Sequence, residues 1–254
     1  MKAKKKLKVW QSAIIITSGV FFVLLLWWVL AISLNTTLFP DPFKTFGVLG
    51  KLIVKPNTWS AIGGTLYRLI ISFVLSFLAA LVIGVIAGLF PVVKNFLKPF
   101  IIVLRTIPTA ALIFVLIVLL KPKMSLFIID FLLMFPILYE AVCTGTENID
   151  TSVIDALKLE TKKTSPLAIT TVIIPMAWPY VILGVVQALG LGMKVSIMSE
   201  VLCGDDKIPG LGRMIYSAYI ETNMPQIFAL TLIAIILSGI LDLTLHYVKR
   251  KYKN

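Results

Sequence analysis

The sequence predicts an all-α integral membrane protein with six transmembrane helices. Of its 254 residues, 59% are hydrophobic and 14% are charged, and the mean hydropathy is +0.98. An average soluble domain has about 45–50% apolar and about 25% charged residues. A water-soluble globule could not bury this much apolar surface, and a disordered chain would be more polar. The apolar residues form continuous runs, which favours helices over the alternating segments of a β-barrel.

Six runs are long enough to cross the membrane, since a helix needs about 20 residues to span about 30 Å of hydrocarbon. The first run follows a lysine-rich N-terminus, but it is longer than a signal-peptide core and no small-x-small cleavage site follows it. We therefore interpret it as a retained anchor. The chain is predicted to be a single transmembrane domain over 1–254. Its spans cover approximately 13–34, 69–90, 100–120, 124–142, 167–193 and 227–248.

The basic residues predict the orientation of these spans. Lysine and arginine number 24 against 12 acidic residues, a net charge of +12. They concentrate before the first span, after the sixth, and in the short segments after spans two and four. The positive-inside rule places these segments and both termini in the cytoplasm, so the charge indicates a lipid bilayer and not nucleic acid. On the opposite side, 35–68 and 194–226 are long, and we expect amphipathic or re-entrant helices there.

Prolines predict that the central spans are kinked. Pro108 lies inside the third span, Pro136 inside the fourth, and Pro175 and Pro179 inside the fifth. Each proline removes one backbone hydrogen bond of its helix. Such breaks are tolerated in membranes where neighbouring helices or a cavity satisfy the backbone again. Kinked helices suit a core that opens and closes, although ordinary packing explains any single proline equally well.

The sequence predicts neither a catalytic centre nor a bound cofactor. It contains no Gly-x4-Gly-Lys-Ser/Thr loop, so the chain does not bind ATP in that manner. His246 is the only histidine, and no cluster of metal ligands is present. Serine, threonine, cysteine and histidine residues form no nucleophile–base set. We therefore expect a protein that is not an enzyme.

Charged residues inside the spans leave alternatives open. Asp130 and Asp242 lie within spans, where an ionisable side chain costs several kcal/mol unless it is paired or hydrated. Structural pairing and a role in transport both explain them, and the same holds for Lys194 and Glu200 near the external end of span five. One alternative function is therefore an ion-coupled secondary carrier that uses Asp130 and Asp242. A channel or scaffold is another.

The cytoplasmic segment 147–165, between spans four and five, predicts a short amphipathic helix. Thr151 or Ser152 can cap its start, and Asp155 lies in its first turn. This helix is too small to be a domain. It has the size of a knob that inserts into a groove of another protein, or of a helix that lies on lipid headgroups. Its apolar face contains Val153, Ile154, Ala156 and Leu157.

At this segment the chain resembles permease subunits of bacterial ABC importers, in the nitrate, sulfonate and taurine branch of the binding-protein-dependent permeases. That family has a cytoplasmic Glu-Ala-Ala loop, then a Gly, then a Leu-Pro at the next span. Asp155-Ala156-Leu157 stands near the first motif, and Ile174-Pro175 stands for the last. Counted back from Pro175, the family's Glu falls at Ala156 and its Gly at Lys162. Other similar segments, in the family's order, are Leu38-Phe39-Pro40-Asp41-Pro42, Thr65-Leu66 with Arg68, Arg105-Thr106-Ile107-Pro108, Pro175, Pro179, Gly184, Glu200 and Gly210-Leu211-Gly212.

The resemblance implies a multi-pass permease subunit of an ATP-driven importer in the bacterial cytoplasmic membrane. It would form the pathway with a second copy of itself. Two separate ATP-binding subunits would carry ATP and Mg, and an extracytoplasmic binding protein would deliver a small solute of the sulfonate, taurine, nitrate or vitamin-precursor type. The ATPase contacts implied by the resemblance are Val153, Asp155, Ala156, Leu157 and Glu160. The residues expected to line or gate the pathway are Arg105, Thr106, Pro108, Thr109, Pro175 and Glu200.

Overall fold

The computed structural model describes residues 9–34, 36–160, 165–205 and 208–251. The lysine-rich N-terminus, residues 161–164 of the predicted coupling loop and residues 206–207 of the external turn lie outside the described residues. Every regular element in the described part of the chain is a helix. The helices are α1 (Val9–Leu34), α2 (Pro42–Val54), α3 (Pro56–Leu89), α4 (Pro91–Thr106), α5 (Thr109–Leu119), α6 (Pro122–Glu147), α7 (Thr151–Glu160), α8 (Pro166–Ala168), the π-helix η1 (Ile169–Ile173), α9 (Ile174–Cys203), α10 (Leu211–Ile220) and α11 (Met224–Lys251).

The predicted all-α membrane fold is confirmed. Five helical stretches are long and apolar enough to cross a membrane, and there are up to six if one bent helix pair counts as a span. The bent pair is α4 and α5, which replaces the predicted third span at 100–120. The two helices meet at 98°. Pro108 explains the bend, because it disfavours helical backbone at the preceding residue, and Ile107 is extended with φ −60° and ψ 127°.

Two helices extend well beyond the spans predicted from hydropathy. α3 begins at Pro56 although the predicted span begins at 69, and α9 ends at Cys203 although the predicted span ends at 193. Hydropathy finds the stretch that faces hydrocarbon, but a helix continues wherever its polar side chains have partners. Here Arg68 of α3 and Glu200 of α9 form an ion pair with each other inside the protein.

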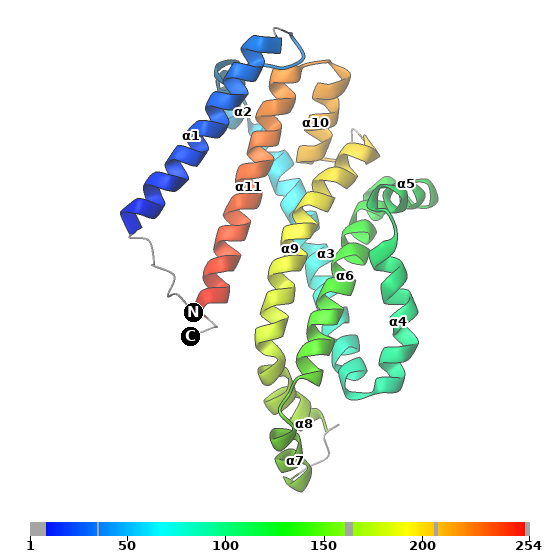
Figure 1. Ribbon diagram of the computed structural model, residues 1–254. Helices are drawn as coiled ribbons and strands as arrows, with labels where there is room; N and C mark the ends of the chain where they lie inside the picture. Colours follow the sequence, from blue (N-terminus) through cyan, green and yellow to red (C-terminus); the bar gives the residue numbers. More distant parts are fainter. Residues whose placement is uncertain (1–8, 35, 161–164, 206–207, 252–254) are drawn as a thin grey trace.

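The centre of the molecule is the bundle of α3, α6 and α9, which lie side by side in Figure 1. Gly84 and Gly88 let the backbones of α3 and α6 approach closely. A Cβ atom on Gly84 would lie 2.8 Å from the Cβ of Val142, and one on Gly88 would lie 2.6 Å from the Cβ of Thr146. Small residues four apart are typical of helix pairs packed within membranes.

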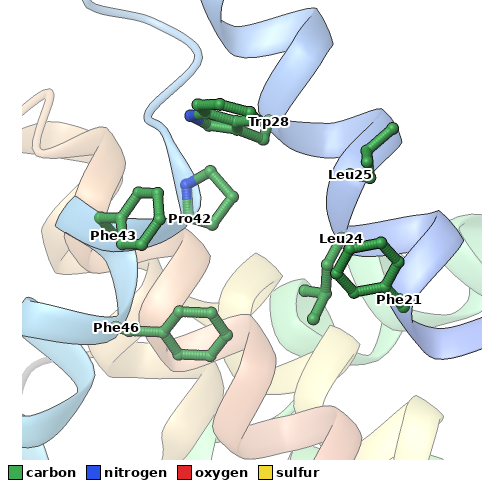
Figure 2. Close-up of a pocket in the computed structure, with 7 residues that line it drawn as sticks. All are labelled: Phe21, Leu24, Leu25, Trp28, Pro42, Phe43 and Phe46. Atoms are coloured by element: carbon green, nitrogen blue, oxygen red, sulfur yellow. The ribbon is translucent and has the colours of Figure 1, made fainter. Parts of the chain in front are cut away.

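α1 lies at the edge of the molecule and diverges from α11 toward its own N-terminus (Figure 1). Only 6% of its membrane-spanning window is buried. Trp27 attaches it, since its ring stacks on Phe228 of α11 at 5.9 Å and its Nε1 donates a hydrogen bond to the carbonyl of Pro40 at 3.1 Å. An apolar cleft of about 330 Å³ lies between α1 and α2, and Figure 2 shows the side chains that line it. The cleft is lined by Phe21, Leu24, Leu25, Trp28, Pro42, Phe43 and Phe46.

The predicted irregularity of span five takes the form of a π-helical turn. η1 occupies Ile169–Ile173, and α9 begins directly after it. Pro175 lacks the N–H that would bond to the carbonyl of Thr171 in an α-helix. In the same turn, the hydroxyl of Thr171 donates a hydrogen bond to the backbone carbonyl of Leu167 at 2.6 Å. This turn lies at the end of the bundle that carries α7 (Figure 1).

Candidate functional site

α7 is the element that the predicted coupling segment forms. The sequence suggested that Thr151 or Ser152 caps its start, but Asp150 is the capping residue. The Oδ1 of Asp150 accepts hydrogen bonds from the backbone N–H of Ser152 at 2.9 Å and from its hydroxyl at 2.8 Å. The hydrogen bond from the Ser152 N–H is the main cause that lowers the pKa of Asp150. The carboxylate is therefore charged at neutral pH, as suits the first turn of a helix.

One face of α7 packs on the chain itself. Val153 and Ile154 contact a buried cluster that includes Val142 of α6 and Ile173 of η1. Leu157 is also buried, with 9% of its surface exposed. The structure turns the Leu157 side chain toward the interior of the protein, and its contact with an ATPase stays a prediction. α7 is joined through these contacts to the bundle end where α9 starts.

The opposite face of α7 is exposed. Ser152, Asp155, Ala156 and Leu159 follow the i, i+3, i+4, i+7 spacing of one helix face, and all four are exposed. Leu159 stands out because 90% of its surface is exposed. Leu159 was not among the predicted ATPase contacts, although its position four residues after Asp155 places it on the same helix face. The side chain of Glu160 lies outside the described part of the structure.

The second candidate region is a buried polar network around Glu200. Arg68 forms an ion pair with the Oε1 of Glu200. The Oε2 of Glu200 accepts hydrogen bonds from the hydroxyl of Thr65 at 3.0 Å and from the N–H of Gly212 at 2.8 Å. The N–H of Leu211 in turn donates to the Thr65 hydroxyl at 3.0 Å. Three of the separate segments that resemble the permease family, at 65–68, 200 and 210–212, therefore meet at one place.

This network holds α3, α9 and α10 together. The first N–H groups of a helix have no partner within it, and they carry the positive end of its dipole. The carboxylate of Glu200 at the start of α10 accepts a hydrogen bond from one of these N–H groups and places a negative charge at the positive end of the dipole. Gly212 is required there, since a Cβ atom would lie 2.6 Å from the Cβ of Glu200. Glu200 is only 3% exposed and lies inside the chain, and its expected role at the translocation pathway or gate stays a prediction.

The other expected pathway residues divide between two places. Arg105, Thr106, Pro108 and Thr109 come together at the bend between α4 and α5, where the first three are exposed and Thr109 is half-buried. Pro175 is exposed at the opposite end of α9, next to η1. The structure therefore supports one cluster of four neighbouring residues and separates it from Pro175.

Ion pairs connect α4 to α6 beside this cluster. Arg105 pairs with Glu140, and the Nζ of Lys94 lies 2.7 Å from both carboxylate oxygens of Glu147. A cleft of about 530 Å³ lies between the two helices and includes these four residues with Lys98 in its lining. Both members of the Arg105 pair are half-exposed, so this contact can open without leaving a buried charge.

Asp130 of α6 and Asp242 of α11 approach α9 at different levels. Asp130 accepts a hydrogen bond from the hydroxyl of Ser196, and its Oδ1 has no hydrogen-bond partner among the described residues. The Oδ1 of Asp242 lies 3.3 Å from where a Cβ on Gly190 would be. Residues 190 and 196 are about 9 Å apart along the helix. The described residues contain no group of three His, Cys, Asp or Glu side chains that could hold a metal.

Five long apolar helices, one bent helix pair and a short helix at one end define a multi-pass membrane protein. The chain belongs to the family of binding-protein-dependent transport system inner membrane components, whose sequence model matches residues 80–254. Membership confirms the resemblance and identifies a permease subunit of an ABC importer.

Relatives and solved structures agree with this assignment. The chain is 26% identical over 220 residues to a probable ABC transporter permease of Brucella melitensis, with 85% of each chain covered. It is 28% identical to a putative ABC transporter permease of Methanocaldococcus jannaschii over 83% of this chain and 76% of the relative. It is 24% identical to the putative aliphatic sulfonates transport permease SsuC of Bacillus subtilis, over 85% and 78%.

The fold is similar to a chain in the inward-facing structure of the MetNI methionine ABC transporter. The TM-score is 0.63 at 19% sequence identity, and the match covers 78% of this chain and 98% of that chain. At this identity the likeness concerns the fold alone.

Proposed function

We propose that the chain, paired with a second copy of itself, forms the translocation pathway of an ATP-driven importer. In this proposal α7 docks onto a separate ATP-binding subunit, which holds ATP and Mg. A binding protein on the other side of the membrane delivers the solute. The observation that supports the proposal best is the exposed face of α7, with Leu159 near its C-terminal end. An exposed leucine on a short helix outside the spans is the kind of side chain that fills a groove in a partner.

The proposed orientation places α7 and both termini in the cytoplasm. It is supported by the positive-inside rule, since the basic residues concentrate in the segments on that side. The α1–α2 connection and α10 then lie on the extracytoplasmic side. Lys94, Lys98 and the end of α6 lie toward the cytoplasm, as the rule expects for the short segment between spans two and three.

The proposed transmission route follows from how α7 is packed. Val153 and Ile154 on its inner face pack against a buried cluster that includes residues of α6 and η1, so a displacement of α7 by the ATPase would act on this cluster, next to the start of α9. The π-helical turn and Pro175 interrupt regular hydrogen bonding there and make this a natural place for a helix to bend. ATP-bound and nucleotide-free ATPases would then favour two arrangements of the bundle, which shifts the population between them.

The proposed solute is small, of the sulfonate, taurine, nitrate or vitamin-precursor type. This proposal is supported by the similarity to SsuC, which is named as a permease for aliphatic sulfonates. MetNI is named as a methionine transporter, so the fold by itself selects no single solute.

The docking proposal is tested by Leu159→Asp with two comparison variants. The tagged chain is co-expressed with its genomic neighbours, purified in detergent, and assayed for bound ATPase. We expect Leu159→Asp to fold and to lose at least tenfold in bound ATPase, because it places a charge on the exposed face. Leu38→Asp changes an exposed leucine between α1 and α2 and should retain full binding.

Leu157→Asp completes the experiment. The side chain of Leu157 is buried, so we expect the Leu157→Asp substitution to lower the thermal stability of the purified chain. The Leu159→Asp substitution should not lower it. Full ATPase binding by a folded Leu159→Asp variant would contradict the assignment of this face. Absence of any bound ATPase with the unmodified chain would contradict the proposed function as a whole.

A further inference from the structure

α9 presents a single exposed stripe along most of its length. After Tyr180, the exposed residues of α9 recur every three or four positions, and so form one face of the helix. The stripe continues through a helix that is long and apolar enough to span a membrane. Two of its five members are polar, which is unexpected on a face turned to lipid. The members are Leu183, Gln187, Leu191, Lys194 and Met198.

The depth of these polar residues follows from the ion pair between Arg68 and Glu200. Arg68 lies just before the uncharged run 69–89 of α3, which is about 32 Å long as a helix and matches the hydrocarbon thickness. Glu200 is therefore level with one edge of the hydrocarbon. At 1.5 Å per residue, Lys194 lies about 9 Å inside that edge and Gln187 about 20 Å inside it, at the far limit of the middle third of the hydrocarbon.

A lysine facing lipid at such depth is costly, because hydrocarbon solvates a charge poorly. Lysines near helix ends escape this cost when their long side chains extend to the interface. Lys194 is poorly placed to do so, because Cα–Cβ bonds in a helix point toward its N-terminus, and the N-terminus of α9 lies on the far side of the membrane from Glu200. The ion pairs of the described residues do not include Lys194 either.

We propose that this α9 stripe faces an aqueous translocation pathway and that Lys194 makes the pathway favour anionic solutes. The inference rests on the proposed function, because it needs a pathway beside α9. Gln187 contributes an amide that can donate and accept hydrogen bonds near the middle of the membrane. Lys194 acts through its electrostatic potential, which the low-dielectric walls of a narrow water-filled pathway focus along it.

The test uses a single cysteine at position 187 as a charge sensor, in the full transporter reconstituted into proteoliposomes. Cys143 and Cys203 are first replaced by Ala and Ser, and Gln187→Cys is added. The modification rate is measured with two methanethiosulfonates, one bearing a sulfonate and one a trimethylammonium group. Each rate is divided by that of a free thiol. Lys194→Glu, Lys194→Gln and Lys194→Arg are then compared in this background.

We expect the thiol of the Gln187→Cys variant to react with both soluble reagents and to favour the anionic one. Lys194→Glu should lower the anionic-to-cationic ratio by roughly tenfold or more, and Lys194→Gln by about the square root of that change, since charge effects on a rate multiply. Lys194→Arg should leave the ratio unchanged. Val82→Cys on α3, in the same background, is the control, since Val82 is 60% exposed within an apolar stretch and should react with neither reagent.

Two results would overturn the inference. A Gln187→Cys variant that reacts with neither reagent shows that the stripe faces lipid or a packed partner helix. A ratio insensitive to Lys194→Glu shows that another group, such as Asp242 beside Gly190, neutralises the lysine. Measuring the bound ATPase in the same preparation shows whether this inference or the proposed function has failed. A charge-dependent ratio without bound ATPase would refute the ATP-driven importer and leave the aqueous stripe intact.

Discussion

The backbone N–H of Gly212 donates a hydrogen bond of 2.8 Å to the carboxylate of Glu200. This contact joins the first turn of α10 to α9 and lies next to the ion pair with Arg68. Both charged side chains are buried, so the network combines a large desolvation cost with an ion pair and three hydrogen bonds. Networks of this kind are sensitive to the loss of one member and much less sensitive to the loss of both charges.

The first prediction concerns this ion pair. Arg68→Met and Glu200→Met should each destabilise the chain by about 3–5 kcal/mol, because each leaves an uncompensated buried charge. The double variant Arg68→Met/Glu200→Met should be more stable than either single variant. Thermal unfolding of the three purified proteins in the same detergent measures this. Additive losses in the double variant would show that the two side chains do not interact.

The second prediction concerns Gly212. Gly212→Ala should lower thermal stability by about 1–3 kcal/mol, in the range for overpacking a tight site, because its Cβ would meet Glu200 and the backbone of α9. Gly63→Ala is the matched control, since its Cβ would meet nothing within 4 Å. In the middle of α3 it should stabilise the helix slightly. Equal effects of both substitutions would refute the proposed crowding at Gly212.

The separate segments of the resemblance were visible in the sequence, but their convergence was not. Thr65, Arg68, Glu200 and Gly212 gave no sign that they share one site, because contacts across more than 130 residues depend on helix packing. For the same reason Glu200 was expected on the pathway, whereas the structure buries it. Hydropathy located the spans because the hydrocarbon imposes a length on each helix. It placed helix ends poorly wherever polar residues find partners inside the bundle.

α7 shows a second limit of sequence reasoning. Its helical character and length were predictable, since a cap and an amphipathic pattern are local features. Which of its faces turns inward was not, because both faces of a ten-residue helix carry a leucine. Leu157 and Leu159 are distinguished only by the position of α6 and η1, which tertiary packing decides.

The third prediction concerns the start of α2. Asp41 caps this helix by accepting a hydrogen bond from the N–H of Lys44 at 2.8 Å, and this bond is the main cause that lowers the pKa of Asp41. Asp41→Ala should cost about 1 kcal/mol and Asp41→Asn much less. A depressed pKa contributes stability above the unfolded value, about 3.9, that is lost as pH falls through the folded value. Thermal unfolding of Asp41→Ala should therefore approach that of the unmodified chain on acidification toward pH 3, and a constant difference would contradict this.

The fourth prediction concerns the α4–α5 bend. Arg105→Gln should change stability by less than about 1 kcal/mol, because the ion pair with Glu140 is half-exposed. It should nevertheless slow ATP-dependent uptake of an organic sulfonate, taurine, by at least fivefold if Arg105 lies at the pathway. Lys94→Gln removes the neighbouring ion pair with Glu147 and serves as the control. Equal uptake by both variants would remove Arg105 from the pathway.

The last prediction separates the ATP-driven importer from an ion-coupled carrier. Asp130 is buried, and its Oδ1 has no hydrogen-bond partner among the described residues, so its charge is poorly compensated. Asp130→Asn retains an oxygen that can accept the hydrogen bond from Ser196 and removes the buried charge. We expect equal or higher thermal stability and ATP-dependent taurine uptake within twofold of the unmodified complex. Asp242→Asn should also retain uptake. Loss of uptake by a stable Asp130→Asn protein, together with uptake driven by a proton or sodium gradient in the unmodified one, would instead assign an ion-coupled role to Asp130.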